Sequence, residues 1–134
     1  MQTLYVMCGI PASGKSTKSR QLAEEYSLTR FSFDEMGCYT TRQFLRPVVA
    51  ALKNGEDVIM DSTHLKTNSR KIILQAVEDI PCRKICVFMN TPFDKCLYRN
   101  ANRDARVPDI AMETMNNSIE LPTLDEGWDE ILYY

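Results

Sequence analysis

Residues 9–16 follow a pattern with a specific chemistry. They read Gly-Ile-Pro-Ala-Ser-Gly-Lys-Ser and match G-x-x-x-x-G-K-[ST] at every fixed position, between an apolar run and a helical pattern. The glycines let backbone N–H groups face an anion, and the helix N-terminus adds partial positive charge. Lys15 can reach the β- and γ-phosphates, and Ser16 can ligate Mg²⁺. We predict binding of ATP or another nucleoside triphosphate, with Mg²⁺, through Gly9, Ile10, Pro11, Ala12, Ser13, Gly14, Lys15, Ser16 and Thr17.

Two aspartates follow short apolar runs further along the chain. Asp34 follows Arg30–Phe33, and its carboxylate could take the proton of an attacking hydroxyl as a general base. Asp61 follows Val58–Met60 and could hold Mg²⁺, directly or through water. Aspartate is also favoured as a helix N-cap, so a capping role is the alternative at both positions.

Thr63 and His64 come directly after the second of these aspartates. Their position predicts that they line the pocket for the molecule that receives the phosphoryl group. A lone histidine is more commonly a surface or hydrogen-bonding residue, which is the alternative interpretation of His64.

Three arginines, Arg99, Arg103 and Arg106, are spaced i, i+4 and i+7 on one face of a predicted helix and its continuation. Arginine stabilises the charge on a migrating phosphoryl group, so these residues are candidates to bind the donor phosphates. We single out Arg103 as catalytic because it stands at the edge of a loop, within a predicted lid at about residues 99–110. A solvated basic surface is the alternative.

Apolar runs alternate with amphipathic segments along the whole chain. Strands are predicted at residues 4–7, 30–33, 58–60, 84–89 and 131–133, and helices at 15–26, 41–53, 67–78, 92–103 and 109–116. This alternation predicts an α/β fold, a three-layer sandwich in which helices flank a parallel sheet of about five strands. In such sheets ligands bind beyond the carboxyl ends of the strands, where the candidate residues fall. The third helix is expected to face inward through Ile72, Ile73, Ala76 and Val77.

Length and composition limit the classes of protein. The chain has 134 residues, with 44% hydrophobic and 25% charged residues, which suits a single globular domain over residues 1–134. No stretch is apolar enough for a membrane span or a secretion signal, and the five cysteines are odd in number. We therefore expect a reduced, cytoplasmic compartment, for which a bacterial or phage-infected cell is plausible, with no membrane partner. Nothing in the sequence predicts the oligomeric state.

The charge is unevenly distributed. The net charge is −2, yet residues 1–106 hold all 16 Lys and Arg against 11 Asp and Glu, a balance of +5. Residues 107–134 hold seven acids and no Lys or Arg, a balance of −7. This asymmetry suggests that the first part of the chain meets an anion.

The motifs in this order resemble the group of P-loop polynucleotide kinases and zeta-toxin-like kinases, most closely the 5′-kinase domains of bacteriophage polynucleotide kinases. The matching segments cover most of the chain: 9–17, Asp34, 61–64, 99–103 with 107–108, and 122–131. The resemblance implies that Lys15 and Ser16 serve ATP and Mg²⁺, and that Asp34 activates the acceptor hydroxyl. It also implies that Asp61 organises the site and that Arg103 is the lid arginine.

Two departures concern the acceptor. Kinases of the phage type carry an arginine three residues after the catalytic aspartate, where it binds a nucleic-acid phosphate. Here that residue is Gly37, and Arg42 is the nearest basic residue beyond it, so we predict that Arg42 contributes to acceptor binding together with Asp34, Thr63 and His64. His64 stands where asparagine is common. Three hypotheses follow: a kinase of the 5′-hydroxyl of DNA or RNA, a kinase of a small molecule such as a nucleoside, sugar or antibiotic, and a nucleotide-binding regulatory or toxin-like module without a transfer reaction.

Overall fold

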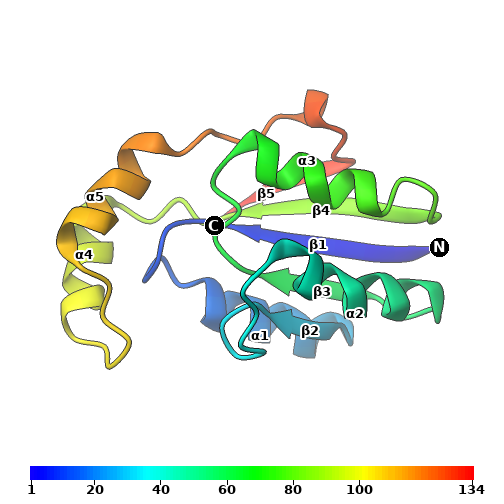
Figure 1. Cartoon of the computed structure of the whole chain (residues 1–134), viewed down its shortest axis with the longest axis horizontal. Helices are drawn as coiled ribbons and strands as arrows, with labels where there is room; N and C mark the ends of the chain where they lie inside the picture. The colour runs from blue at the N-terminus through cyan, green and yellow to red at the C-terminus, as the bar shows by residue number, and fades with distance from the viewer.

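The computed structural model describes all 134 residues, and its centre is a sheet of five parallel strands (Figure 1). The strands lie in the order β2-β3-β1-β4-β5, and every neighbouring pair is parallel. Their carboxyl ends therefore meet at one edge of the sheet. The strands are β1 (Gln2–Cys8), β2 (Thr29–Ser32), β3 (Val58–Asp61), β4 (Cys82–Phe88) and β5 (Glu130–Tyr133).

Helices cover both faces of this sheet. Side chains alternate along a strand, so Leu4 and Val6 of β1 pack with α2 and α3, whereas Tyr5 and Met7 pack with Leu22 of α1 on the opposite face. Both sets are buried, which explains the unbroken apolar runs of the central strands. The helices are α1 (Lys15–Tyr26), α2 (Thr41–Lys53), α3 (Thr67–Ala76), α4 (Phe93–Ala101), α5 (Asp109–Ser118) and the 3₁₀ helix η1 (Leu124–Glu126).

The pair formed by α4 and α5 projects beyond the carboxyl edge of the sheet (Figure 1, left). Ile10 and Leu65, from loops at that edge, pack with Cys96 of α4 and Met112 of α5 in a small separate core. The predicted lid at residues 99–110 lies at the junction of these two helices. None of the helices has the length and apolar character needed to cross a bilayer.

The predicted α/β sandwich is confirmed, and helices 15–26 and 41–53 have the predicted bounds. The inward face of α3 was wrong at two positions, since Ile72 is 41% exposed and Ala76, one turn further on, is exposed too. Arg70, Ile73 and Leu74 are the buried residues of α3. Because Arg70 takes an inward position, the residue two places on points away from the sheet. The helix also ends at Ala76, two residues earlier than predicted.

Candidate functional site

The loop between β1 and α1 has the tight backbone that its glycines predict. A Cβ on Gly9 would lie 2.8 Å from Ser13 Oγ and 3.0 Å from Met89 Cβ, so no side chain fits there. Gly14 has φ 97°, a left-handed conformation that favours glycine, and it stands directly before α1. The sequence therefore folds into a loop that presents its backbone at a helix N-terminus.

Hydrogen bonds to residues beyond the ends of two strands anchor this loop to the sheet. Gly9 N donates to Thr63 O at 2.9 Å, beyond the end of β3. Thr91 Oγ1 donates to Ser13 O at 2.7 Å, beyond the end of β4. The loop is thus fixed to the sheet on both sides.

Polar groups within the loop fit an anion. Ser13 is 1% exposed and its hydroxyl has no hydrogen-bond partner, although buried polar groups are normally paired. Lys15 Nζ donates to Ile10 O at 2.8 Å, which holds the ammonium over the loop. Burial, together with the charge of Arg103, lowers the pKa of Lys15 to about 8 against the opposing effect of Asp61. A bound phosphate would accept from the Ser13 hydroxyl and favour the charged lysine.

Asp61 lies at the carboxyl end of β3, where its buried carboxylate is bonded to two side chains. Its Oδ2 accepts from Ser19 Oγ at 2.9 Å and from Arg30 Nη2 at 2.7 Å. No helix is capped by Asp61, since α3 begins after Lys66. Ser16 lies exposed one turn before Ser19 in α1.

The residues present fit a magnesium ion that is held mainly by phosphate oxygens. No group of three His, Cys, Asp or Glu side chains could hold a metal by itself. Mg²⁺ commonly relies on one or two protein ligands together with substrate phosphates. Ser16 and Asp61 would hold it here.

Asp34 and Glu35 follow β2 in a turn, and their carboxylates differ in environment. Glu35 Oε2 accepts from Arg30 Nη1 at 2.8 Å and from Arg20 Nη2 at 3.3 Å, and the hydrogen bond from Arg30 lowers the pKa of Glu35. The carboxylate of Asp34 has no such partner and lines the cleft. It caps no helix either, because Thr40 caps α2 through a capping box with Gln43. Asp34 is therefore the acid of this turn that pairs with no cation and lines the cleft.

Arg99 reaches the phosphate loop from α4, and Arg103 lines the cleft from the turn that follows this helix. A Cβ on Gly14 would lie 3.6 Å from Arg99 Nη1. Arg103 Nε donates to Ala105 O at 3.1 Å. The buried Asn100 closes this turn by exchanging two hydrogen bonds with the backbone of Val107, at 2.6 and 2.9 Å. Both arginines line the cleft opposite the sheet, and Arg99 lies beside the phosphate loop.

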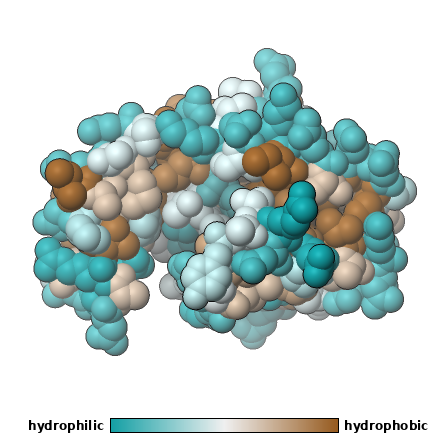
Figure 2. Space-filling view, in the orientation of Figure 1, coloured by the Kyte–Doolittle hydropathy of each residue, from teal (hydrophilic) through white to brown (hydrophobic).

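These groups line one cleft of about 1080 Å³ between the lid and the sheet, which Figure 2 shows as a hollow beside the lobe of α4 and α5. The phosphate loop forms one wall and the turn after β2 another. The cleft brings together most of the predicted residues: Pro11, Ala12, Ser13, Gly14, Lys15, Ser16, Thr17, Asp34, Asp61, Thr63, Arg99 and Arg103.

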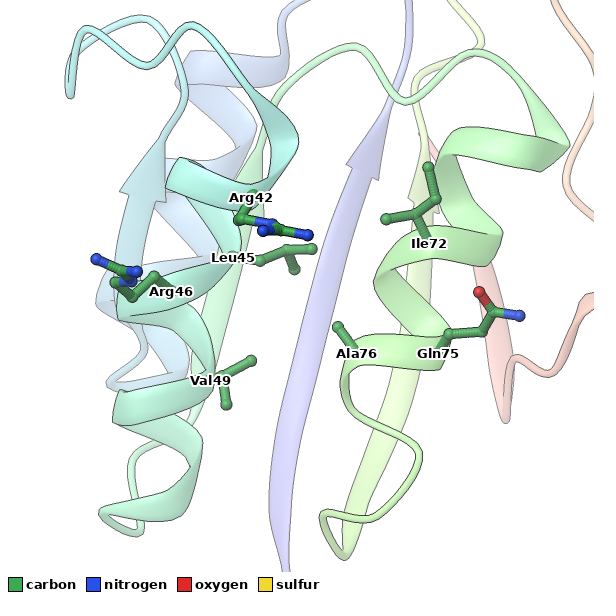
Figure 3. A pocket seen from close by; sticks show the side chains of 7 residues that line it. All are labelled: Arg42, Leu45, Arg46, Val49, Ile72, Gln75 and Ala76. Carbon is green, nitrogen blue, oxygen red and sulfur yellow. The ribbon is translucent and has the colours of Figure 1, made fainter.

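Five predicted residues do not line the cleft. Gly9 and Ile10 are buried within the loop, and the side chain of Ile10 packs into the small core under α4 and α5. The other three lie elsewhere. Arg42 lines a separate groove of about 570 Å³ between α2 and α3, where it lies beside Leu45 and faces Ile72 (Figure 3). Arg106 is exposed and pairs with Asp109 at 3.3 Å, at the start of α5. His64 is 8% exposed and lies beneath the cleft.

His64 has a structural environment. Its Nδ1 lies 2.7 Å from Met7 O, and its ring stacks on Phe44 with an interplanar angle of 11°. Its φ is 46°, a left-handed conformation that asparagine also adopts readily. Burial, with the charges of Lys15 and Arg70, lowers the pKa of His64 to about 4.

Sequence reasoning missed Arg30 and Ser19. Arg30 Nε donates to Ser19 Oγ at 2.8 Å, and both contact Asp61. A signal was present, because Arg30 is a charged residue inside a short strand that ends at the predicted catalytic turn.

Comparison with known proteins places the chain among P-loop kinase-like folds. A family model described as an AAA domain matches residues 37–122, well over half of the chain, beginning after the phosphate loop. A bifunctional polynucleotide phosphatase/kinase of Schizosaccharomyces pombe is 23% identical over 97% of this chain, which spans about a third (33%) of that relative.

Two solved structures share the fold. A sugar kinase from Janibacter sp. HTCC2649 superposes with a TM-score of 0.75 at 17% identity, covering 99% of this chain and 86% of that one. A fungal RNA kinase superposes with a TM-score of 0.73 at 13% identity, covering 98% of this chain and 73% of that one.

Proposed function

Because the chain belongs to this AAA domain family, we propose that it is an ATP-dependent kinase that transfers the γ-phosphoryl group to a hydroxyl acceptor. One observation carries the proposal. A phosphate loop with an unpaired buried hydroxyl at Ser13 faces the same cleft as the free carboxylate of Asp34. Donor and acceptor groups of a phosphoryl transfer need this arrangement.

The residues of the cleft divide the chemistry between them. Asp34 accepts the proton of the acceptor hydroxyl while that oxygen forms a bond to the γ-phosphorus. The bond from this phosphorus to the β–γ bridging oxygen breaks, and ADP leaves. Lys15 and Arg103 stabilise the charge that spreads over the phosphoryl oxygens, and Arg99 binds donor phosphates. Mg²⁺ held by Ser16 and Asp61 supplies further neutralisation of that charge when it is bound.

For the acceptor we propose the 5′-hydroxyl of DNA or RNA. The family resemblance of the motifs supports this choice, as does the relative from Schizosaccharomyces pombe, whose name includes a polynucleotide kinase.

A small hydroxylated molecule is the second candidate acceptor. Gly37 favours it, because the position where a clamp for a nucleic-acid phosphate is expected has no side chain. The sugar kinase that shares the fold shows that this architecture serves a small acceptor in another protein.

Transfer from γ-labelled ATP tests these proposals. A 5′-hydroxyl oligonucleotide is compared with a panel of nucleosides, sugars and antibiotics, and label is expected in the oligonucleotide. Asp34→Asn should lower kcat by about 10²–10⁴-fold and leave nucleotide affinity unchanged. Glu24→Gln, an exposed acid on α1, is the matched control. Label transfer to no acceptor would refute the kinase, and label only in a small molecule would move the proposal to the second acceptor.

A further inference from the structure

The guanidinium of Arg30 joins three elements around the cleft. From β2 it donates to Ser19 of α1 at 2.8 Å and to Asp61 of β3 at 2.7 Å. It also pairs with Glu35 in the turn after β2 at 2.8 Å. The side chain of Arg30 is 14% exposed and Asp61 is buried, so their contact is largely shielded from water, whereas the side chain of Glu35 is 52% exposed. Hydrogen bonds to carboxylates in such an environment are strong and directional.

Asp61 depends on this arginine for its counterion and its orientation. The residue is 5% exposed, and a buried carboxylate without a partner is costly. Oδ2 is bonded to both Arg30 and Ser19, and no other cation pairs with it. The guanidinium therefore sets the plane of the carboxylate that faces the cleft.

The same guanidinium fixes the turn that carries Asp34. The turn is closed by hydrogen bonds from Met36 N to Ser32 O at 3.0 Å and from Gly37 N to Asp34 O at 3.1 Å. Glu35 anchors it to the sheet through Arg30, which leaves Asp34 as the free acid. One side chain thus connects the donor side of the cleft with the acceptor side.

We propose that Arg30 is a positioning residue that sets Asp61 for the divalent cation of the bound nucleotide and, through Glu35, holds the turn that presents Asp34. This inference rests on the proposed kinase function. Arg30 touches neither the phosphate loop nor the acceptor; it acts through the two acids. Lysine cannot replace it fully, because an ammonium lacks the planar fork that reaches three partners at once.

Nucleotide binding with and without Mg²⁺ tests the proposed effect of Arg30 on Asp61. The affinity of a fluorescent ATP analogue is measured in EDTA and across a Mg²⁺ concentration series for wild type, Arg30→Met and Arg30→Lys. Arg30→Met should raise the Mg²⁺ concentration at half-saturation by about 10–100-fold, with affinity in EDTA nearly unchanged. Arg30→Lys should recover part of this loss. Arg83→Met is the matched control, since Arg83 also pairs with a glutamate from a strand but outside the cleft.

A separate variant tests the proposed effect of Glu35 on the turn that carries Asp34. Glu35→Gln should lower kcat by about tenfold, because small misplacements of a catalytic group are costly, and should leave the Mg²⁺ dependence of nucleotide binding as in wild type. KM for the acceptor should change little, since Glu35 holds the turn and does not bind the acceptor.

Two results would overturn the inference. One is an Arg30→Met variant that melts at the wild-type temperature and shows the wild-type Mg²⁺ dependence of nucleotide binding. The other is an unchanged kcat in Glu35→Gln. If Arg30→Met does not fold, the same Mg²⁺ series is measured on Ser19→Ala, because this substitution removes the hydroxyl that bonds to both Arg30 and Asp61. A wild type that transfers no phosphoryl group refutes the kinase and, with it, the proposed effect of Glu35 on Asp34. The proposed effect of Arg30 on Asp61 is still decided by the binding measurements, which need no acceptor.

Discussion

Arg70 and Glu126 form a bidentate ion pair inside the protein. Arg70 Nε donates to Oε1 at 2.8 Å and Nη2 to Oε2 at 3.0 Å, and the arginine side chain is completely buried. The third nitrogen donates to His64 O at 2.9 Å, in the loop behind the phosphate loop. The pair therefore joins α3, η1 and the β3–α3 loop, and it supports the cleft from below.

Breaking this pair should destabilise the fold. Glu126→Gln leaves the charge of Arg70 buried without a counterion, and we expect a loss of about 3–5 kcal/mol in the free energy of unfolding, measured by urea denaturation. Arg70→Met combined with Glu126→Gln removes both charges, and the single amide oxygen still accepts from one of the two donors, Trp128 Nε1 or Thr123 N, that Glu126 binds through separate oxygens. The double variant should therefore lose much less than the sum of the two single variants. Additive losses would contradict a coupled pair.

The fold and the phosphate loop were readable from sequence because they rest on local signals. Strand and helix periodicity gave the order of elements, and G-x-x-x-x-G-K-[ST] marked the loop between Gly9 and Ser16. Asp34 and Asp61 were found because they directly follow apolar strands. Parallel strands gather such residues at one edge, so their meeting in one cleft follows from topology.

The residues that sequence reasoning missed or misplaced depend on contacts between distant parts of the chain. Arg30 meets Asp61 only because β2 pairs with β3 in a register that matches Ser32 with Asp61. Arg42 lies in another groove because the helix it starts runs along the sheet face. Periodicity does not report such pairings, and neither does spacing along the chain.

Acid should destabilise the protein through His64. Burial keeps its folded pKa at about 4, below the ordinary value of 6.5, so the unfolded chain binds the proton first as pH falls. Stability is therefore lost between pH 6.5 and 4, by about 3 kcal/mol from this group. His64→Asn suits the left-handed backbone and removes the titrating group. Denaturant unfolding across this range should show a flatter pH dependence in the variant; equal slopes would exclude His64 as the cause.

Alkaline pH should weaken ATP binding through Lys15. Its pKa of about 8 in the free protein means that the ammonium is lost just above neutrality, while bound phosphates favour the charged form. The apparent dissociation constant should rise by about tenfold between pH 7 and pH 9, as linkage requires. Lys15→Met should bind ATP weakly with little pH dependence over this range. A wild-type affinity that stays constant to pH 9 would contradict the lowered pKa.

An arginine at Gly37 should improve binding of nucleic-acid acceptors. A Cβ at this position would meet nothing within 4 Å, so a long side chain has room, although φ of 66° costs about 1–2 kcal/mol for a residue with a Cβ. In the phage-type kinases that the motifs resemble, an arginine here grips a phosphate. A charge-assisted hydrogen bond from Gly37→Arg should lower KM for a 5′-hydroxyl oligonucleotide by about tenfold.

Gly37→Ala is the matched variant, because it adds the same backbone strain without the cation. Its KM for the oligonucleotide should stay at the wild-type value, and its melting temperature should fall as much as that of Gly37→Arg. A nucleoside without a phosphate should gain nothing from the arginine. An equal gain for nucleoside and oligonucleotide would show that the new cation does not act on the acceptor's phosphates, and that the turn beside Asp34 does not face a nucleic-acid strand.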